Sequence, residues 1–504
     1  MSAPAADTLF LVRLSGEIAT KGRGTRLHFT RQLVRNLADA LAAAGLPHRI
    51  QREWSRLFVE APAAAAEVLP RVFGVHSVSP VERRSWRTLD DVVAAGEELF
   101  AAAVAGKRFA VRARRGGDRR FVPFRSGDVD RALGARLLPV AAGVDLGDPE
   151  VTVRVEIREG EAYFFTERLP GFAGLPAGTE GRALSLVSGG FDSAVASWLL
   201  LKRGVRLDYL FCNLGGEAHL EGTLKVMKLI AERWSHGYRP RLHAVDLQPV
   251  VAGLQQRTEP RYWQVVLKRL MLHAANQLAR ELRCDALVTG EAVGQVSSQT
   301  LRNLRAISEV AELPILRPLV GANKEEIVEQ ARRIGTYELS AAVAEYCALH
   351  PRRPATHAGV GAVREEEGKL DLAAIAAAVA ARQVYDLKEL DLAALGDPEL
   401  AVAAIPQDAV LIDLRSPAAF AAWHHPRARR MDYFGALAEH RGFPRERHYV
   451  FYCEVGLKSA HLAEVLRRDG FTAHHLRGGV KEVLRQVQEE DPALTALLSP
   501  ALLG

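Results

Sequence analysis

The chain has 504 residues, of which 48% are hydrophobic and 25% charged, a composition typical of folded globular proteins and not of disordered ones. At roughly 100–200 residues per domain, this length predicts about three or four domains. The 66 Lys and Arg residues outnumber the 60 Asp and Glu residues, which gives a net charge of +6. So small an excess indicates a polyanionic partner only where the basic residues cluster.

Four cysteines are present, at positions 212, 284, 347 and 453, and no two of them form a CxxC pair. This spacing argues against zinc fingers, zinc ribbons and cysteine-ligated iron–sulfur clusters, so no metal site is predicted. The N-terminal sequence lacks the pattern of a signal peptide, and no stretch approaches the roughly 18 apolar residues of a membrane span. We therefore expect a cytoplasmic protein with reduced thiols and no membrane partner.

Two small mixed units are predicted before residue 168. The first, residues 1–62, combines a strand at 7–14, a helix with apolar spacing from Phe29 to Leu41, and one or two strands at 49–60. The second, residues 63–167, has helices near 63–73 and 89–104 and strands near 107–114 and 151–166. The Gly- and Pro-rich segment 169–181 marks a boundary.

A doubly wound parallel sheet is predicted within residues 178–395. Short apolar strands at 184–187, 208–213, 243–247 and 286–290 alternate with helical stretches at 191–203, 221–234, 262–283 and 323–334. That alternation is typical of a parallel sheet with helices on both faces. Residues 355–405 look helical and linker-like. A smaller α/β unit, residues 406–492, has strands at 409–414, 448–453 and 473–476 and a helix at 459–469, so the fold class is multidomain α/β and α+β.

The first strand of the large sheet runs into Ser188-Gly189-Gly190-Phe191-Asp192-Ser193, which leads into a helix. Adjacent glycines allow close approach of a ligand, and the helix N-terminus offers unpaired amides to an anion. Since no Gly-Lys-Ser/Thr follows, this is not a Walker A loop, and it suits pyrophosphate as a leaving group. The alternative is a Ser- and Gly-rich turn without a ligand. The whole string resembles the loop of the PP-loop ATP pyrophosphatases, which adenylate a carbonyl oxygen.

Ligands of doubly wound sheets lie beyond the carboxyl ends of the strands. Those ends are Leu186 and Val187, Phe211 and Cys212, and Gly290, which begins a polar, glycine-bearing loop. Lys268 lies on an intervening predicted helix, where it either neutralises phosphate or belongs to a solvated helix face. Cys212 and Cys284 lie in or beside apolar stretches and are expected in the core.

The most basic segment of the chain is Lys107–Arg125, which has eight Lys and Arg residues against a single acid and three interleaved phenylalanines. Clustered cations release counterions from a phosphate backbone, so the segment is a candidate RNA-binding face. The alternative is a strand edge that charge protects from aggregation. The candidate RNA-binding residues are Lys107, Arg112, Arg114, Arg115, Arg119, Arg120 and Arg125.

Cys453 ends a predicted strand and opens the loop Cys-Glu-Val-Gly-Leu-Lys-Ser before a helix. Loop amides and a helix N-terminus both stabilise a thiolate or persulfide anion, although a buried structural cysteine is the alternative. The unit resembles a rhodanese-like domain, whose catalytic cysteine occupies such a loop. By itself, the sequence around Cys347 indicates only a structural cysteine.

The order of these units resembles the tRNA sulfurtransferase family that makes 4-thiouridine, over nearly the whole chain. Residues 69–78 and 109–121 are similar to its THUMP domain, and the strings LSLVSGGFDS, TGEAVGQVSSQT and EYC (345–347) to its ATPase domain. The resemblance implies an N-terminal ferredoxin-like domain (1–62), a THUMP RNA-binding domain (63–167), a PP-loop ATPase domain (178–395) and a rhodanese-like domain (406–492).

The same resemblance implies the site and its partners. ATP, with Mg²⁺, would contact the loop residues Ser188, Gly189, Gly190, Asp192 and Ser193 and also Leu186, Val187, Phe211, Cys212, Lys268, Gly290 and Gln299. Cys453 would carry a persulfide loaded by a cysteine desulfurase, Cys347 would be its disulfide partner, and Asp192 would serve the ATP-dependent step. The target would be uridine 8 of tRNA. Two alternatives remain: a sulfur donor acting mainly on a carrier protein for thiamine thiazole synthesis, and a different PP-loop RNA-modifying ligase.

Overall fold

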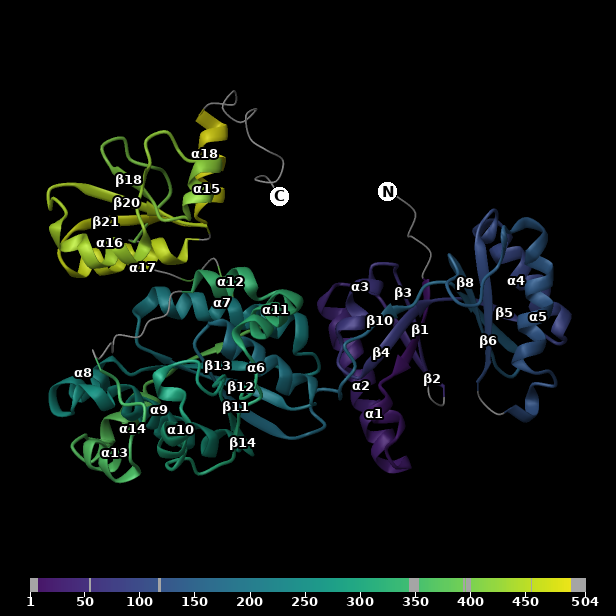
Figure 1. The fold of residues 1–504 in the computed structure, drawn as a ribbon, viewed down its shortest axis with the longest axis horizontal. Coiled ribbons are helices and arrows are strands. Elements are labelled where there is room, and N and C mark those ends of the chain that lie inside the picture. The colour runs from purple at the N-terminus through teal and green to yellow at the C-terminus, as the bar shows by residue number, and fades with distance from the viewer. Residues whose placement is uncertain are drawn as a thin grey trace. The chain divides into compact units, whose positions relative to one another are not determined.

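The computed structural model describes residues 8–53, 56–116, 119–343, 353–392, 395, 400–454 and 456–490. The chain divides into two compact units, Met1–Glu180 with Lys202–Gly204, and Gly181–Leu201 with Val205–Gly504. Each unit contains two sheets of the described residues (Figure 1). No helix in these ranges has the length and apolar character needed to cross a membrane.

An antiparallel sheet of order β10-β4-β1-β3-β2 begins the first unit. Its elements are β1 (Thr8–Leu14), α1 (Gly16–Ala19), α2 (Arg23–Ala43), β2 (Arg49–Glu53), β3 (Arg56–Ala61), α3 (Ala65–Val68), η1 (Leu69–Arg71), β4 (Val75–Pro80) and β10 (Leu169–Pro170). Leu33, Leu37 and Leu41 form the buried stripe of α2, as their spacing predicts. Strand β4 pairs with β1 and buries Val75 and Val78 in this core. Residues 75–80 therefore belong to this sheet, whereas the sequence analysis assigned them to the second predicted unit, residues 63–167.

The second sheet of this unit has the order β5-β9-β8-β6-β7. Its elements are β5 (Glu82–Ser85), α4 (Leu89–Val104), β6 (Arg108–Arg115), η2 (Arg119–Phe121), α5 (Ser126–Leu137), η3 (Leu138–Val140), β7 (Gly143–Val144), β8 (Val151–Ile157) and β9 (Glu161–Phe165). A small apolar cluster joins the two sheets, with Phe58 stacked on Tyr163 at 4.6 Å between ring centroids. The two sheets can therefore form a common binding surface.

The large sheet of the second unit has the order β15-β14-β11-β12-β13-β16. Its strands are β11 (Arg182–Val187), β12 (Arg206–Asn213), β13 (Arg241–Asp246), β14 (Ala286–Val288), β15 (Ile315–Leu316) and β16 (Gln383–Asp386). Its helices are α6 (Phe191–Lys202), α7 (Gly216–Trp234), α8 (Gln248–Arg257), η4 (Pro260–Tyr262), α9 (Trp263–Leu282), η5 (Ser297–Gln299), α10 (Leu301–Ser308), α11 (Lys324–Ile334), α12 (Tyr337–Ala342), α13 (Val360–Glu367) and α14 (Ala373–Ala380).

The strands of this sheet are parallel except β16, which pairs antiparallel with β13. The stretch expected as a linker thus supplies an edge strand and two helices to the sheet's own domain. Helix α14 buries Ile375 and Val379 in the same core as α9. The Ala-rich segment, which is too short to span a membrane, is therefore a helix that packs on this core.

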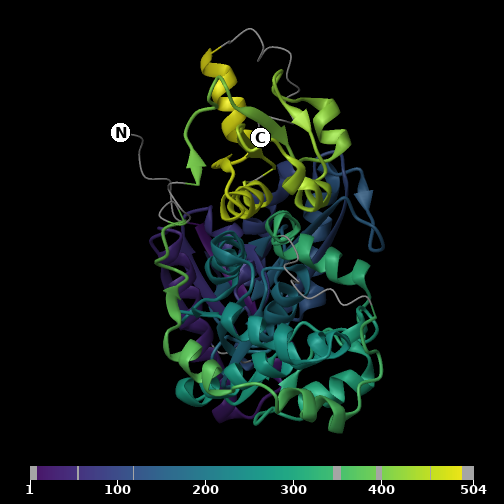
Figure 2. The same ribbon diagram turned by 90° about the vertical axis from the view of Figure 1, so that its left-hand side faces the viewer.

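The last sheet is parallel, with the order β17-β21-β20-β18-β19. Its elements are β17 (Ala401–Val402), β18 (Val410–Asp413), α15 (Pro417–Ala422), β19 (Arg429–Arg430), α16 (Tyr433–Glu439), η7 (His440–Gly442), β20 (His448–Tyr452), α17 (Leu457–Arg468), β21 (Thr472–Leu476) and α18 (Val480–Glu490). Separate apolar clusters fill its two faces, and helices flank it on both sides (Figure 2). This is the small α/β unit that the sequence predicts.

Candidate active site and nucleic-acid interface

The order of the large sheet determines where a ligand binds. Strand β11 is central, with β12 and β13 on one side and β14 and β15 on the other. The connections therefore diverge at β11, so a ligand is expected at the carboxyl edge, beside the loops after β11 and β14. The loop Ser188–Ser193 lies at this point.

Hydrogen bonds within the loop after β11 fix its shape. Ser193 Oγ accepts from the Ser188 amide at 3.2 Å and donates to the Gly190 carbonyl at 3.1 Å. Gly189 has a φ of +74°, and a Cβ there would lie 2.9 Å from Thr223 Oγ1, so both conformation and space require glycine. The loop leads directly into α6, whose first-turn amides are available to an anion.

Two side chains from distant parts of the chain hold Asp192. Lys324 Nζ donates to Asp192 Oδ1 at 2.8 Å, and Gln295 Nε2 donates to Oδ2 at 2.8 Å. The sequence analysis missed both residues. Since Gln295 follows β14 and Lys324 follows β15, the rule about carboxyl strand ends could have found them.

The loop after β14 contacts the backbone of the loop Ser188–Ser193, which we term the phosphate loop. A Cβ on Gly290 would lie 2.7 Å from the carbonyl carbon of Asp192 and 2.8 Å from the Ser193 amide. Further along, the Gln299 side chain is 8% exposed, and its Oε1 lacks a hydrogen-bond partner among the described residues. An unsatisfied buried acceptor is suited to a hydrogen-bond donor from a ligand.

Lys268 does not belong to a solvated helix face. Its Nζ lies 2.9 Å from Glu291 Oε1, and Arg317 Nε lies 2.8 Å from Glu291 Oε2. Burial by itself would raise the pKa of Glu291, but the two ion pairs outweigh it and lower that pKa. This carboxylate therefore stays charged and holds both cations beside the loop after β14.

The predicted strand-end residues lie side by side, because Val187 pairs with Phe211 in parallel register. Val187, Phe211 and Cys212 are buried, and Leu186 is half-buried. Burial raises the pKa of the Cys212 thiol to about 12, so this thiol is not a nucleophile near neutral pH. Both Cys212 and Cys284 lie in the apolar core, as predicted.

Cys453 lies between β20 and α17, in the loop that the sequence singled out. The Gly456 amide donates to its Sγ at 3.2 Å, and Ser459 Oγ lies 3.6 Å away. The side chain is 1% exposed, so in this conformation the loop encloses the sulfur. The amide and the helix N-terminus together suit a sulfur anion. Cys347, its expected partner, lies outside the described residues.

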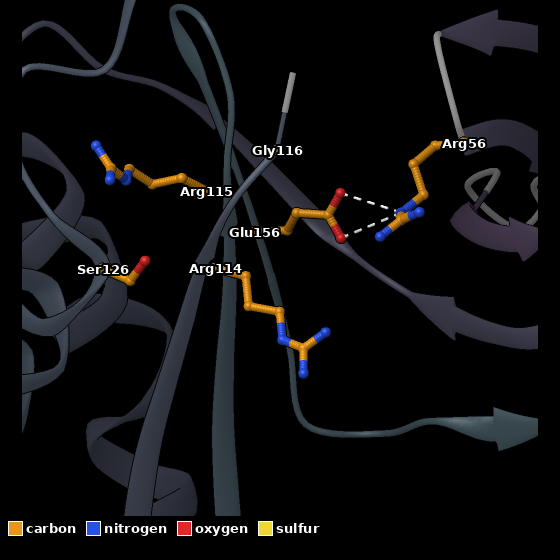
Figure 3. A pocket seen from close by; sticks show the side chains of 6 residues that line it. All are labelled: Arg56, Arg114, Arg115, Gly116, Ser126 and Glu156. Carbon is orange, nitrogen blue, oxygen red and sulfur yellow. Dashed lines mark hydrogen bonds and ion pairs between the residues drawn. The ribbon is translucent and has the colours of Figure 1, made fainter. Parts of the chain in front are cut away.

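A basic cavity opens between the two sheets of the first unit. It has a volume of about 300 Å³ and is lined by Arg13, Leu14, Arg56, His76, Arg112, Arg114, Arg154, Val155, Glu156, Phe165 and Arg168. An adjoining cavity of about 420 Å³ is lined by Arg56, Arg114, Arg115, Gly116, Ser126 and Glu156 (Figure 3). Arg56 pairs with Glu156 at 3.2 Å, so one carboxylate faces many guanidinium groups.

Burial and neighbouring positive charge both act on Arg13 in this cavity. Burial lowers the pKa of Arg13 to about 10, and neighbouring arginines add to the shift against the opposing effect of Glu156. Such an excess of positive charge favours binding of an anion.

Of the predicted RNA-binding residues, Arg112, Arg114 and Arg115 line these cavities. Lys107, Arg120 and Arg125 are exposed outside the lining, and Arg119 lies in η2. Arg13, Arg56, Arg154 and Arg168 were missed, because isolated basic residues on separate strands form no cluster in the sequence.

Comparison with known proteins covers each of these regions. The family models for the ThiI ferredoxin-like domain, the THUMP domain, the Thiamine biosynthesis protein (ThiI) and the rhodanese-like domain match residues 9–79, 87–167, 178–372 and 397–486, respectively. These matches confirm the predicted fold class. Apart from the limit at 62, beyond which β4 still pairs with β1, the domain limits at 167, 178, 395, 406 and 492 stay predictions.

Two curated relatives and one solved structure extend the similarity over most of the chain. A tRNA sulfurtransferase of Pyrobaculum aerophilum is 40% identical over 469 residues, covering 92% of this chain and 95% of the relative. One of Thermoplasma acidophilum is 36% identical over 470 residues, covering 93% and 94%. A 4-thiouridine synthetase solved with RNA and bound ATP is 30% identical, with a TM-score of 0.66, and covers 76% of this chain and 99% of its own. The chain therefore belongs to the tRNA sulfurtransferase family of enzymes.

Proposed function

We propose that this chain uses ATP to activate the C4 oxygen of uridine 8 in tRNA and replaces that oxygen with sulfur carried as a persulfide on Cys453. One observation carries the proposal: a single chain contains two loops with complementary chemistry. In the loop Ser188–Ser193, Lys324 and Gln295 hold the carboxylate of Asp192. In the loop of Cys453, the Gly456 amide donates a hydrogen bond to Sγ. The relatives named tRNA sulfurtransferase and the synthetase solved with RNA and ATP support it.

ATP suits the carboxyl edge of the large sheet beside β11. The glycine loop and the α6 amides would bind its phosphates, and the unsatisfied Gln299 Oε1 would accept a hydrogen bond from the nucleotide. Leu186, Val187 and Phe211 provide the apolar strand ends. Mg²⁺ usually keeps water and binds one or two carboxylates together with phosphates. Asp192, whose two oxygens accept hydrogen bonds from Lys324 and Gln295, is the carboxylate that this loop would supply.

The C4 oxygen of uridine is a poor leaving group and must first be activated. The uridine O4 attacks the α-phosphorus of ATP, pyrophosphate leaves, and O4 can then depart as AMP. The loop amides and the ammonium groups of Lys324 and Lys268 would stabilise the negative charge that develops on the phosphates. Asp192 and Glu291 fix the two lysines by ion pairs, which positions these charges before the reaction.

Sulfur would arrive through two cysteines. A cysteine desulfurase loads Cys453, and the outer persulfide sulfur attacks C4, so that AMP leaves. The thiolate of Cys347 then attacks Sγ of Cys453, which forms a disulfide and releases 4-thiouridine. A thiol reductant must reduce this disulfide before the next turnover, in a reducing compartment for which we propose the cytoplasm. The role of Cys347 rests on the family resemblance.

The basic cavities of the first unit would hold the tRNA backbone. Arginines from both sheets converge there, and this arrangement fits binding by phosphate contacts and by the shape of the RNA. The name of the family model matching residues 178–372, Thiamine biosynthesis protein, favours a second role. In that role the Cys453 persulfide would also supply sulfur to a carrier protein for thiazole synthesis.

Two variants separate the half-reactions. Cys453→Ser should abolish sulfur incorporation into tRNA but leave tRNA-dependent pyrophosphate release intact, whereas Asp192→Asn should abolish both pyrophosphate release and sulfur incorporation while sparing persulfide formation on Cys453. Cys284→Ser, which changes a buried thiol in the core, is the control. Mass spectrometry of digested tRNA detects the replacement of oxygen by sulfur. Normal thiolation by Cys453→Ser would refute the sulfur relay.

A further inference from the structure

Two loops at the carboxyl edge of the large sheet, together with the first residue of α10, display apolar side chains to solvent. Val293, Val296, Leu301 and Val320, which we term the apolar rim, are 45%, 50%, 71% and 45% exposed. In the described part of the chain they make up four of the twelve exposed large hydrophobic residues. A concentration of this kind usually marks a binding surface.

The rim is held by hydrogen bonds, so its exposure is a feature of a fixed structure. The Val293 amide donates to the Val320 carbonyl at 3.1 Å, which joins the two loops. The Gly294 amide donates to the Gln299 carbonyl at 3.0 Å and closes the first loop on itself. Ser297 Oγ donates to Gln264 Oε1 at 2.8 Å and ties the same loop to α9.

The rim lies beside the loop Ser188–Ser193, where ATP would activate the uridine. Gln295, between Val293 and Val296, contacts Asp192 at 2.8 Å. Lys324, four residues after Val320, contacts the other oxygen of Asp192 at 2.8 Å. A base that lies on the rim would therefore have its O4 near the loop Ser188–Ser193. This is the position from which O4 can reach the α-phosphate of ATP.

Cations accompany these apolar residues. Arg302 and Arg305 are exposed on α10 immediately after Leu301, and Lys324 is 44% exposed at its side chain. Apolar surface beside cations suits an unstacked nucleotide, because the base covers the apolar side chains while its phosphates meet the charges. A protein segment would require acidic groups to match these cations, so the combination favours RNA.

We propose that the apolar rim receives the target uridine, turned out of the RNA stack, and holds its face so that O4 points toward the phosphate loop. Enzymes that act on a base within folded nucleic acid commonly expose it in this way and pack it against apolar side chains. The inference rests on the proposed function and assigns to it a pyrimidine subsite made of Val293, Val296, Leu301 and Val320.

The test compares Val296→Ser and Leu301→Ser with Val384→Ser. Val384 is 49% exposed on β16, at the opposite edge of the same sheet, so it matches the rim valines in type and exposure. Pyrophosphate release with ATP and tRNA, without any sulfur donor, measures activation alone. We expect kcat/KM for tRNA to fall about tenfold in each rim variant, with KM for ATP and persulfide loading of Cys453 unchanged, and Val384→Ser to equal the wild type.

Each other result overturns the proposal. A raised KM for ATP would mean that the nucleotide covers the rim. Normal pyrophosphate release with impaired thiolation would mean that the persulfide domain docks there. Rim variants indistinguishable from Val384→Ser would refute the subsite and leave the proposed function intact, whereas a wild-type chain that releases no pyrophosphate with tRNA would refute both.

Discussion

Replacing Gly290 with alanine should impair the ATP-dependent activation of the uridine, because the added Cβ displaces the loop Ser188–Ser193. The added Cβ would lie 2.7 Å from the carbonyl carbon of Asp192 and 2.8 Å from the Ser193 amide, whereas ordinary contacts begin near 3.4 Å. One of the two loops must therefore move by about 0.7 Å. The obstacle is backbone and not the end of a flexible side chain, so rotation of a side chain cannot relieve it.

A displacement of this size in a reacting group reduces the rate by up to about 100-fold, equivalent to about 2.7 kcal/mol of activation free energy. Initial rates of tRNA thiolation at saturating ATP and tRNA measure the effect, and thermal unfolding confirms that the variant is folded. Gly253→Ala is the matched control, since a Cβ on Gly253 of α8 meets nothing within 4 Å. A folded Gly290→Ala variant with a rate within twofold of the wild type would refute the reasoning.

Three further predictions concern other parts of the chain. Lys324→Met removes the 2.8 Å ion pair with Asp192, so tRNA-dependent pyrophosphate release should fall at least tenfold while persulfide loading of Cys453 continues; equal release would contradict this role. Arg114→Ala, in the basic cavities, should weaken tRNA binding and reduce the slope of the logarithm of the binding constant against the logarithm of the salt concentration by about one. Arg131→Ala is the control, because the Arg131 side chain is 78% exposed on α5, and it should leave both quantities unchanged. Hydrogen bonds from Arg364 and Arg269 lower the pKa of Glu309 from 4.5 to about 2. A lowered folded-state pKa stabilises the protein above the unfolded value, so the melting-temperature difference between wild type and Glu309→Gln should be largest above pH 5 and vanish as the pH falls toward 2.

Local sequence predicted most elements of the second unit. Strands β11, β12, β13 and β20 and helices α6, α9 and α17 lie within a few residues of their expected positions, because apolar runs and glycine-bearing turns report local backbone preference. The sequence predictions were wrong where strand pairing between distant segments determined which sheet a segment joins. Strand β4 joined β1 across the first unit, and β16 joined the large sheet from a stretch that reads as a linker.

The phosphate loop and the cysteine loop could be recognised in the sequence because their chemistry lies within six or seven consecutive residues. Lys324 and Gln295 could not be recognised in that way, since they lie 132 and 103 residues from Asp192. The arginines of the basic cavities are likewise dispersed over several strands.

The sequence by itself determined the order of the units, the glycine loop and the position of the sulfur-bearing thiol, since each depends on neighbouring residues and their backbone angles. Only the tertiary structure decided which charges surround Asp192, which carboxylate holds Lys268 and which arginines share one cavity. The physical reason is that a parallel sheet brings the carboxyl ends of strands far apart in the chain to one edge, and that edge exists only once the strand order is set.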